Sequence, residues 1–447
     1  MNKLYAGFAR VNITPMFGIG LAGYFEERLA NHVMDELEIN ALALSCDDDK
    51  VLLISIDNLG FECNVATAYR EHISKETGIP VEAIYIHATH THTAPFLKKD
   101  SENIFEQEYF QMVYRKMADV SKFAIADLKP AKMGWAIGDA PNIAFVRRYR
   151  MKDGSVRTNP GVNNPEISHP IGDVDERVTV LRFDREDAEN IVLVNFADHP
   201  DTVGGCNVSA DWPGLLRQTV EKTLDDVKCI FFNGAQGDVN HVNVHPKDGD
   251  FNDMFVDFDD VSRGYGHARY MGRVVTGGVL QAYDKVKYID VESLRFANRM
   301  VRIPSNMPNP EDVPEARRIY NLHLEGKDNE IPYEGMMLTT MLAKARRTVN
   351  LEHGPEYFDM ELSAVAVGNV ALIGIPGEPF TGVGRALKED EKWELVIPTC
   401  LTNGKQGYFP MKDAYAEGGY EAQGSLFKEG VAELIIEEGK QLIEKLI

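Results

Sequence analysis

Long apolar runs are missing from this sequence. Its hydrophobic stretches are far too short to span a bilayer, and the first residues, MNKLYAGFARVNITP, lack the basic and apolar regions of a signal peptide. Cysteine is scarce as well, with five residues in 447, odd in number and without motif spacing. Such cysteines are typical of reduced, mostly buried thiols. We therefore expect a cytoplasmic protein without stable membrane association.

Basic residues are outnumbered. Lys and Arg total 47 against 69 Asp and Glu, which gives a formal net charge of −22. Such a charge repels phosphate backbones and anionic membrane surfaces, so nucleic acid is not an expected partner. Good solubility is enough to explain the charge, and the side chains described below indicate a small-molecule substrate.

The chain also lacks internal repeats, low-complexity tracts and Ser/Gly-rich linkers. Short runs rich in Val, Ile and Leu alternate with segments whose apolar residues recur every three or four positions. The predicted strands are 38–46, 51–56, 83–88, 178–183, 191–196, 228–232, 362–367 and 370–375. The predicted helices are 64–77, 105–128, 213–225, 263–283, 311–325 and 428–445. This alternation predicts an α/β fold, a mixed sheet with helices on both faces and the active site at the carboxyl ends of strands.

Two segments do not fit this alternation. Residues 150–170 are rich in Gly, Pro, Asn and charge, which predicts a long loop. Residues 245–260 are strongly acidic and carry Phe251, Phe255 and Phe258. Each segment is either a lid or substrate wall, or a solvated loop.

Three histidines, His87, His90 and His92, stand at the end of the predicted strand 83–88. Functional groups of α/β sheets gather just beyond strand ends, and imidazole is a common metal ligand. We expect His90 and His92 to point to opposite faces, so that one binds a metal while the other faces another part of the pocket. The alternative is that these histidines only pack in the core. Three histidines within six residues favour a functional site over that alternative.

Three further strand ends carry polar residues. His199 follows the run IVLVNFAD and is either a hydrogen-bonded structural histidine or a ligand. Glu378, in IPGEPF, is either a hard metal ligand or a carboxylate at a helix N-terminus. In NGAQGDVN, residues 233–240, Asp238 would orient a ligand histidine, unless the segment is a turn without chemistry.

These motifs together resemble neutral/alkaline, non-lysosomal ceramidases, zinc amidases that split ceramide into sphingosine and fatty acid. THTHTAP, residues 89–95, is similar to the family signature THTHSGP. The other matches follow in chain order: GLAGY at 20–24, FADHP at 196–200, GAQGDV at 234–239, IPGEPF at 375–380, NGKQGY at 403–408 and DAYAEGGYE at 413–421. The resemblance covers most of the chain.

The resemblance implies that a single Zn²⁺ is bound by four residues: His90, His199, Glu378 and Tyr408. It further implies that His92 is the general base or proton shuttle and that Tyr420 donates to the tetrahedral oxyanion. An arginine completes this oxyanion site in the family.

We assign that arginine to Arg147 rather than Arg148, although Val146 stands where the family has Asn. Arg148, Asn233 and Gln236 are taken as candidate substrate-binding residues. The cations of this segment would bind a carboxylate or another polar group, or pair with local acids.

The chain departs from the family near its end. Ceramidases of this family are usually secreted or membrane-associated and carry a C-terminal β-sandwich, whereas a predicted helix here follows soon after the tyrosine segment. We expect a single catalytic domain, 1–447, acting as a zinc-dependent hydrolase on an amide or ester bond, chiefly an N-acyl bond, of a soluble polar substrate. The alternatives are a true ceramidase, a metal-dependent lyase acting on a carbohydrate-like substrate, and a non-catalytic binding protein, against which the retention of all four ligands argues.

Overall fold

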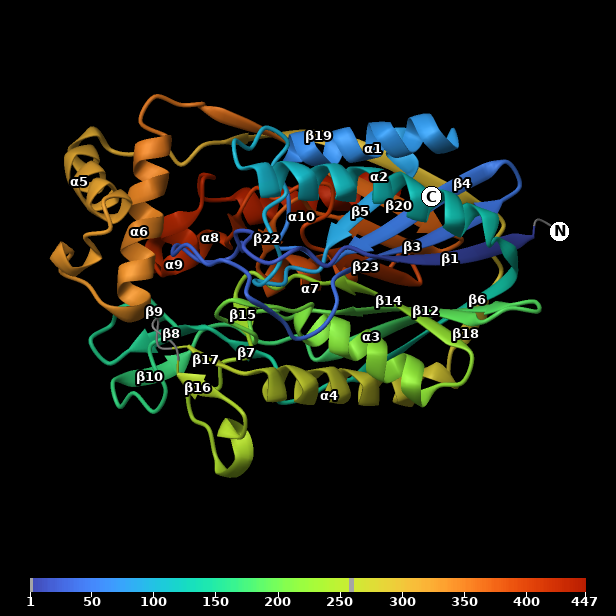
Figure 1. Ribbon diagram of the computed structural model, residues 1–447, viewed down its shortest axis with the longest axis horizontal. Coiled ribbons are helices and arrows are strands. Elements are labelled where there is room, and N and C mark those ends of the chain that lie inside the picture. The colour runs from blue at the N-terminus through green and yellow to red at the C-terminus, as the bar shows by residue number, and fades with distance from the viewer. Residues whose placement is uncertain (1–2, 257–260) are drawn as a thin grey trace.

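The computed structural model describes residues 3–256 and 261–447, and nine of its strands form one mixed sheet (Figure 1). Along the main path the strands are β14 (Val227–Asn233), β12 (Asn190–Phe196), β11 (Arg177–Arg185), β6 (Lys129–Asp139), β1 (Leu4–Asn12), β3 (Glu38–Cys46), β4 (Asp49–Ile56) and β5 (Ile84–Ala88). The ninth strand, β18 (Lys287–Ile289), pairs with β6. The outermost pairs, β4–β5 and β12–β14, are parallel, whereas the adjacent pairs β3–β4 and β11–β12 are antiparallel.

The sheet curls so that its two ends meet. The Ser55 hydroxyl on β4 donates to the Phe231 carbonyl on β14 at 2.6 Å. Alternate residues of one strand consequently face different apolar layers: Ile191 and Leu193 join the core between the two halves, while Val192 and Val194 face outward toward helices. Burial on both sides explains why these strands read as continuous apolar runs.

Helices cover both outer sides of this curled sheet. On one side lie α1 (Cys63–Thr77) and α2 (Ile104–Ala126), and on the other α3 (Asp211–Thr223) and α4 (Tyr265–Tyr283) (Figure 1). α4 lies directly on β6, because any side chain at Gly138 would overlap the Gly278 carbonyl. The predicted α/β class and its helix-covered mixed sheet are confirmed, with boundaries shifted by one or two residues at most elements.

A second sheet packs against the first. It consists of β19 (Leu294–Pro304), β20 (Tyr357–Val367), β21 (Val370–Gly374) and β23 (Leu395–Thr399). Val365 and Val367 join the main core, whereas Ala364 and Ala366 face α7 (Thr381–Lys388) and α10 (Val431–Glu444). A helical pair, α5 (Val313–Leu324) and α6 (Gly335–Asn350), stands at one end of the molecule beside α8 (Lys412–Glu417) and α9 (Tyr420–Gly424) (Figure 1).

Short strands line the loops around the main sheet. They are β2 (His32–Val33) with β13 (Asn207–Val208), β7 (Phe145–Val146) with β15 (Val239–Asn240), β16 (Phe255–Val256) with β17 (Ser262–Arg263), and the trio β8 (Arg148–Met151), β9 (Val156–Thr158) and β10 (Ile167–Pro170).

The prediction of a loop at 150–170 is therefore wrong in part. Its Gly, Pro and Asn residues form the turns of a three-stranded sheet, in which β8 pairs with both β9 and β10. In the segment 245–260, Phe251 ends a short 3-10 helix and Phe255 begins β16, whereas Phe258 lies outside the described residues. Within residues 3–256 and 261–447, no helix has the length and apolar composition needed to cross a membrane.

Candidate metal centre

Three strand ends carry the candidate metal ligands to one place. His90 follows β5, His199 follows β12, and Glu378 begins the short strand β22 (Glu378–Pro379) beyond β21. β22 pairs in parallel with β24 (Tyr408–Phe409), and this register puts Glu378 directly beside Tyr408. The sheet topology thus joins segments that are far apart in the chain.

Backbone carbonyls fix the two ligand histidines. His90 Nδ1 lies 2.6 Å from the Leu59 carbonyl oxygen, and His199 Nδ1 lies 3.0 Å from those of Gln236 and Val239. A ring nitrogen that faces a carbonyl carries the proton, because a carbonyl can only accept. Both histidines therefore present the lone pair of Nε2. Burial, followed by the charge of Arg147, lowers the pKa of His199 to about 4, so its ring is neutral at pH 7.

The two lone pairs meet the carboxylate of Glu378. Its Oε2 lies 3.3 Å from His90 Nε2 and 3.1 Å from His199 Nε2. Glu378 is 4% exposed, and Oε2 has no hydrogen-bond partner among the residues that the structure describes. Three acceptors that face one another in a dry site repel unless a cation joins them. The donor set therefore fits a metal ion, and two histidines with one glutamate are a common catalytic zinc set.

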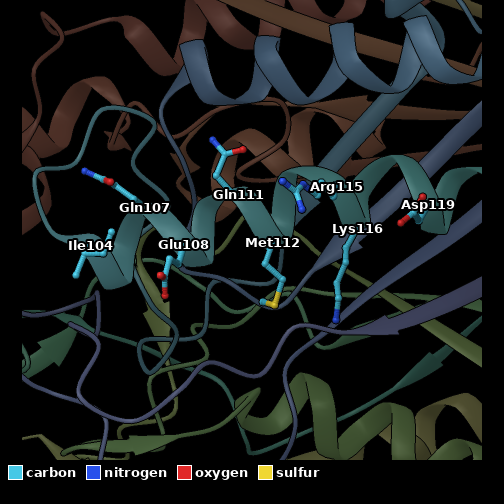
Figure 2. Close-up of a pocket in the computed structure, with 8 residues that line it drawn as sticks. All are labelled: Ile104, Gln107, Glu108, Gln111, Met112, Arg115, Lys116 and Asp119. Carbon is cyan, nitrogen blue, oxygen red and sulfur yellow. The ribbon is translucent and has the colours of Figure 1, made fainter.

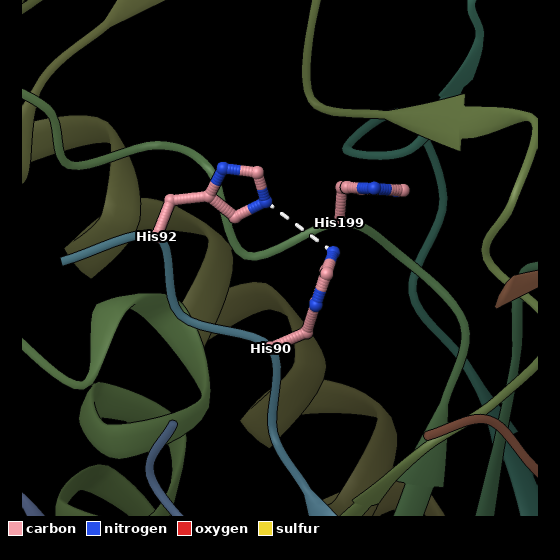
Figure 3. Close-up of side chains that lie close together, drawn as sticks. All are labelled: His90, His92 and His199. Carbon is pink, nitrogen blue, oxygen red and sulfur yellow. Dashed lines mark hydrogen bonds between the residues drawn. The ribbon is translucent and has the colours of Figure 1, made fainter. Parts of the chain in front are cut away.

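His92 joins this group from the turn that follows β5. We expected the two side chains to point to opposite faces, and that prediction is wrong, because even in extended backbone residues two apart point to the same face. β5 ends at Ala88, and a φ of 77° puts His90 in the left-handed region, so the two rings meet in a turn and not along a strand. The Nε2 atoms of His90 and His92 consequently lie 3.3 Å apart (Figure 3). With His199 they form a buried group that could hold a metal ion, its nitrogens within 4.8 Å of one another.

The other ring nitrogen of His92 faces Asp201. Nδ1 lies 3.5 Å from Asp201 Oδ1, and this carboxylate also accepts a hydrogen bond from the Tyr24 hydroxyl and pairs with Arg263 at 3.2 Å. Burial lowers the pKa of His92 well below its usual value, which leaves the ring neutral at pH 7. Sequence reasoning missed Asp201. Its signal was a carboxylate two residues after His199, in the same strand-end turn.

Two tyrosines and an arginine complete the centre. The Tyr408 ring lies 5.6 Å from the Tyr420 ring and 6.4 Å from the His199 ring. Burial and the charge of Glu378 raise the pKa of Tyr408, while Arg147 opposes the rise. Arg147 lies 5.2 Å from the centre of the Tyr408 ring and pairs through Nε with Glu421 at 2.7 Å. Of the two adjacent arginines, Arg147 is the one that faces the centre.

Among known proteins, only comparison of structures gives matches. No protein family and no curated protein matches the sequence. Two solved structures match the whole chain over 75% of their own length, at 16% identity. They are the neutral ceramidase from Pseudomonas aeruginosa, with a TM-score of 0.75, and a ceramidase complexed with C2, with a TM-score of 0.74. The chain has a neutral-ceramidase-like fold. This confirms the resemblance stated from the motifs, at the level of the fold.

Within this ceramidase-like fold, Arg148 contacts the segment just before Tyr420. Its Nη2 contacts Glu417 at 3.0 Å and the Gly418 carbonyl at 3.2 Å, and its guanidinium lies 5.5 Å from the centre of the Phe380 ring. Arg150 pairs with the same Glu417 at 2.7 Å. The cations of this segment thus pair with a local acid, which is one of the two outcomes expected for them, and the substrate-binding role of Arg148 stays a prediction.

Asn233 and Gln236 lie against the turn that carries His199, and their predicted substrate-binding role stays a prediction. Asn233 donates to Gln236 Oε1 and to the Asp198 carbonyl, and both predicted substrate-binding side chains are fully buried. Asp238 does not orient a ligand histidine as predicted. Its carboxylate accepts from the amide and hydroxyl of Thr381, at the start of α7. The two histidines take their orientation from carbonyls instead, because the strand-end turns of the ceramidase-like fold bring those carbonyls into contact with Nδ1.

His87 has a structural role in the fold. Its Nδ1 lies 2.8 Å from the Cys400 carbonyl oxygen, and its Nε2 accepts from the Asn233 amide at 2.9 Å. Burial lowers the pKa of His87 to about 3, and the ring remains neutral. It joins β5, β14 and the segment after β23. Both ring nitrogens of His87 thus contact backbone groups, so the structural alternative considered for the three histidines fits this one.

A separate depression of about 600 Å³ runs along the outer face of α2 (Figure 2). Its lining residues all come from this single helix, from Ile104 to Asp119. None of them is a residue of the metal centre, and we assign no chemistry to it.

Proposed function

We propose that this protein is a zinc-dependent hydrolase that cleaves an amide bond of a small, soluble, polar substrate. The observation that carries the proposal is the buried contact of Glu378 Oε2 with the Nε2 atoms of His90 and His199, whose Nδ1 atoms are held by carbonyls. Tyr408 is proposed as the fourth ligand, because its strand places it beside Glu378. A zinc ion bound by these residues would acidify water and polarise the scissile carbonyl.

The remaining residues are proposed to move protons and balance charge. His92, with Asp201 on its Nδ1, takes a proton from the attacking water and returns it to the leaving nitrogen. Tyr420 and Arg147 stabilise the negative charge that develops on the carbonyl oxygen. Overall one water is consumed, the C–N bond breaks, and a carboxylic acid and an amine are released. We also propose that residues 1–447 act as one catalytic domain, because the centre draws on segments from His90 to Tyr420.

Metal content and product mass test the proposal. Purified protein should contain about one zinc per chain by elemental analysis, lose turnover with a chelator and regain it with Zn²⁺. Mass analysis should show products that together equal the substrate plus one water, whereas elimination by a lyase would add none.

The structural likeness to ceramidases favours one competing substrate, so N-acyl-sphingosine belongs in the panel beside soluble N-acyl amino acids and N-acyl amino sugars. Turnover of N-acyl-sphingosine alone would refute the soluble-substrate part of the proposal. Full folding without metal and without turnover would refute the enzyme as a whole.

A further inference from the structure

Two cations without acidic partners lie near the metal centre. Lys405 belongs to the segment between β23 and β24, and Arg346 to α6. Within residues 3–256 and 261–447, neither side chain has a carboxylate at ion-pair distance. In a protein with a net charge of −22, in which Arg147 and Arg148 both pair with acids, two unpaired cations in one region need an explanation.

Lys405 is held against the backbone near Glu378. Gly60 has a φ of +132°, and a Cβ at this position would lie 2.8 Å from Lys405 Cδ, so the stem of Lys405 packs on the glycine. The ammonium is close enough to Glu378, Glu62 and Arg346 to interact with their charges, and burial lowers the pKa of Lys405. Glu62 is exposed and Glu378 is proposed as a metal ligand. A bound metal ion would balance the charge of Glu378 and leave Lys405 without compensation.

Arg346 belongs to the helix that packs on the one beginning at Tyr420. α6 packs on α9, where the Gly424 position lies against Ala343, and the Arg346 guanidinium lies 4.8 Å from the centre of the Phe25 ring. Among charged groups, Arg346 has the largest effect on the pKa of Tyr420, which it lowers against the stronger effect of burial. The charge of Arg346 thus reaches both the tyrosine proposed to bind the reacting carbonyl and Lys405.

We infer that Lys405 and Arg346 form an anion-binding subsite, and that the substrate is an amide carrying a carboxylate which they hold while its N-acyl bond lies at the metal centre. This inference rests on the proposed function and names its substrate class. An ammonium and a guanidinium are the usual partners of a carboxylate, and the planar guanidinium can bind it through two hydrogen bonds. An uncharged lipid amide would leave the ammonium of Lys405 unpaired in a partly dry site.

A matched set of substrates tests the inference. N-acetylglycine, N-acetyl-β-alanine and N-acetyl-4-aminobutyrate, each paired with its uncharged carboxamide, vary the distance between amide and anion. We expect the zinc-loaded protein to prefer one of the carboxylates to its carboxamide by about 10- to 100-fold in kcat/KM, as hydrogen bonds to charged groups allow. Equal kcat/KM values for carboxylate and carboxamide in all three pairs would overturn the inference.

Variants assign the effect to the two cations. Lys405→Met and Arg346→Met should each remove most of this preference by raising KM for the carboxylate. Arg115→Met is the matched control, because Arg115, on α2, is likewise an exposed helical arginine that makes no ion pair with the residues that the structure describes (Figure 2). An unchanged preference in both variants, or an equal loss in Arg115→Met, would refute the assignment. Arg346 is exposed, so its variant should fold even if Lys405→Met does not.

Equilibrium binding separates this inference from the proposed function. If the loaded protein binds N-acetyl-β-alanine more tightly than its carboxamide, loses that difference in Arg346→Met and yet hydrolyses neither, the subsite is supported and the hydrolase proposal fails. If the protein hydrolyses amides of both kinds equally well, the hydrolase proposal is supported and the subsite fails.

Discussion

His92 and Glu378 are predicted to have different roles, proton transfer for His92 and metal binding for Glu378. Two metal sites are possible on geometry alone: His90, His199 and Glu378 with Tyr408, or the three histidines His90, His92 and His199. In the first, His92 carries protons and binds no metal. We therefore expect His92→Ala to retain zinc and Glu378→Gln to lose it.

The expected losses of kcat and of zinc affinity follow from the proposed roles of His92 and Glu378. Loss of a general acid–base group lowers kcat by about 10²- to 10⁴-fold, so His92→Ala should lose about 3–5 kcal/mol of transition-state stabilisation with near-normal zinc affinity. Groups that merely orient a ligand are worth about 10- to 100-fold in metal affinity, so replacing Glu378 itself should cost more than about 100-fold. Glutamine keeps the size of Glu378 but not its charge, and therefore tests the carboxylate rather than the packing.

Competition with a chelator of known zinc affinity, followed by single-substrate kinetics on zinc-saturated protein, measures both quantities. Arg115→Met serves as the control for handling, because its side chain lies on the outer helix α2. If His92→Ala lost zinc while Glu378→Gln kept it, the three-histidine site would be correct and our assignment of roles would be refuted.

Three further predictions address the surroundings of the centre. Tyr420→Phe should lower kcat by about 10²-fold with little change in KM, as expected of an oxyanion donor, and a change in KM alone would contradict this role. Gly237→Ala should weaken zinc binding about 10- to 100-fold, because a Cβ there would lie 2.5 Å from the Glu378 carbonyl oxygen and displace this strand; unchanged zinc affinity in chelator competition would contradict it. For His87, the folded-state pKa of about 3 lies below the unfolded value of about 6.5, so the unfolded state binds the extra proton and stability falls as pH drops through this window. Between pH 7.5 and 5, urea unfolding of the wild type should show about 2 kcal/mol more loss than that of His87→Gln, and parallel losses would exclude this role.

Local patterns in the chain were sufficient to predict most helices and strands and to find the motifs in their order. Runs such as IVLVNF, residues 191–196, predicted buried strands because each residue faces one of two apolar layers. Elements whose patterns are weaker were missed. β1, β6 and β19 have partly exposed residues that blur the apolar run, and α6 begins with glycine and two methionines instead of a polar cap.

The candidate ligands could be predicted from their strand ends and from the motif order, but not their contacts. Arg147 and Arg148 are adjacent and identical in type, so only the alternation of side chains at β7 and β8 decides which one faces His199. Lys405 and Arg346 carry no local signal, because an isolated charge in a loop or on a helix is usually a solvated one, and the only local signal of Asp201 is its place two residues after His199. Their significance comes from what lies beside them in space.

The sequence by itself determined the α/β class, the strand ends at which His90, His199 and Glu378 stand, and the composition of the proposed donor set. The class and the strand ends depend on local propensity and on burial of short apolar runs, which are properties of consecutive residues, whereas Tyr408 joins the donor set only through the family resemblance. Only the tertiary structure decided that the ring of His92 turns toward His90 and Asp201, that carbonyls and not Asp238 orient the ligands, and that Lys405 packs on Gly60. Such contacts join residues that are distant in the chain, and they depend on how the curled sheet and its strand-end turns pack together.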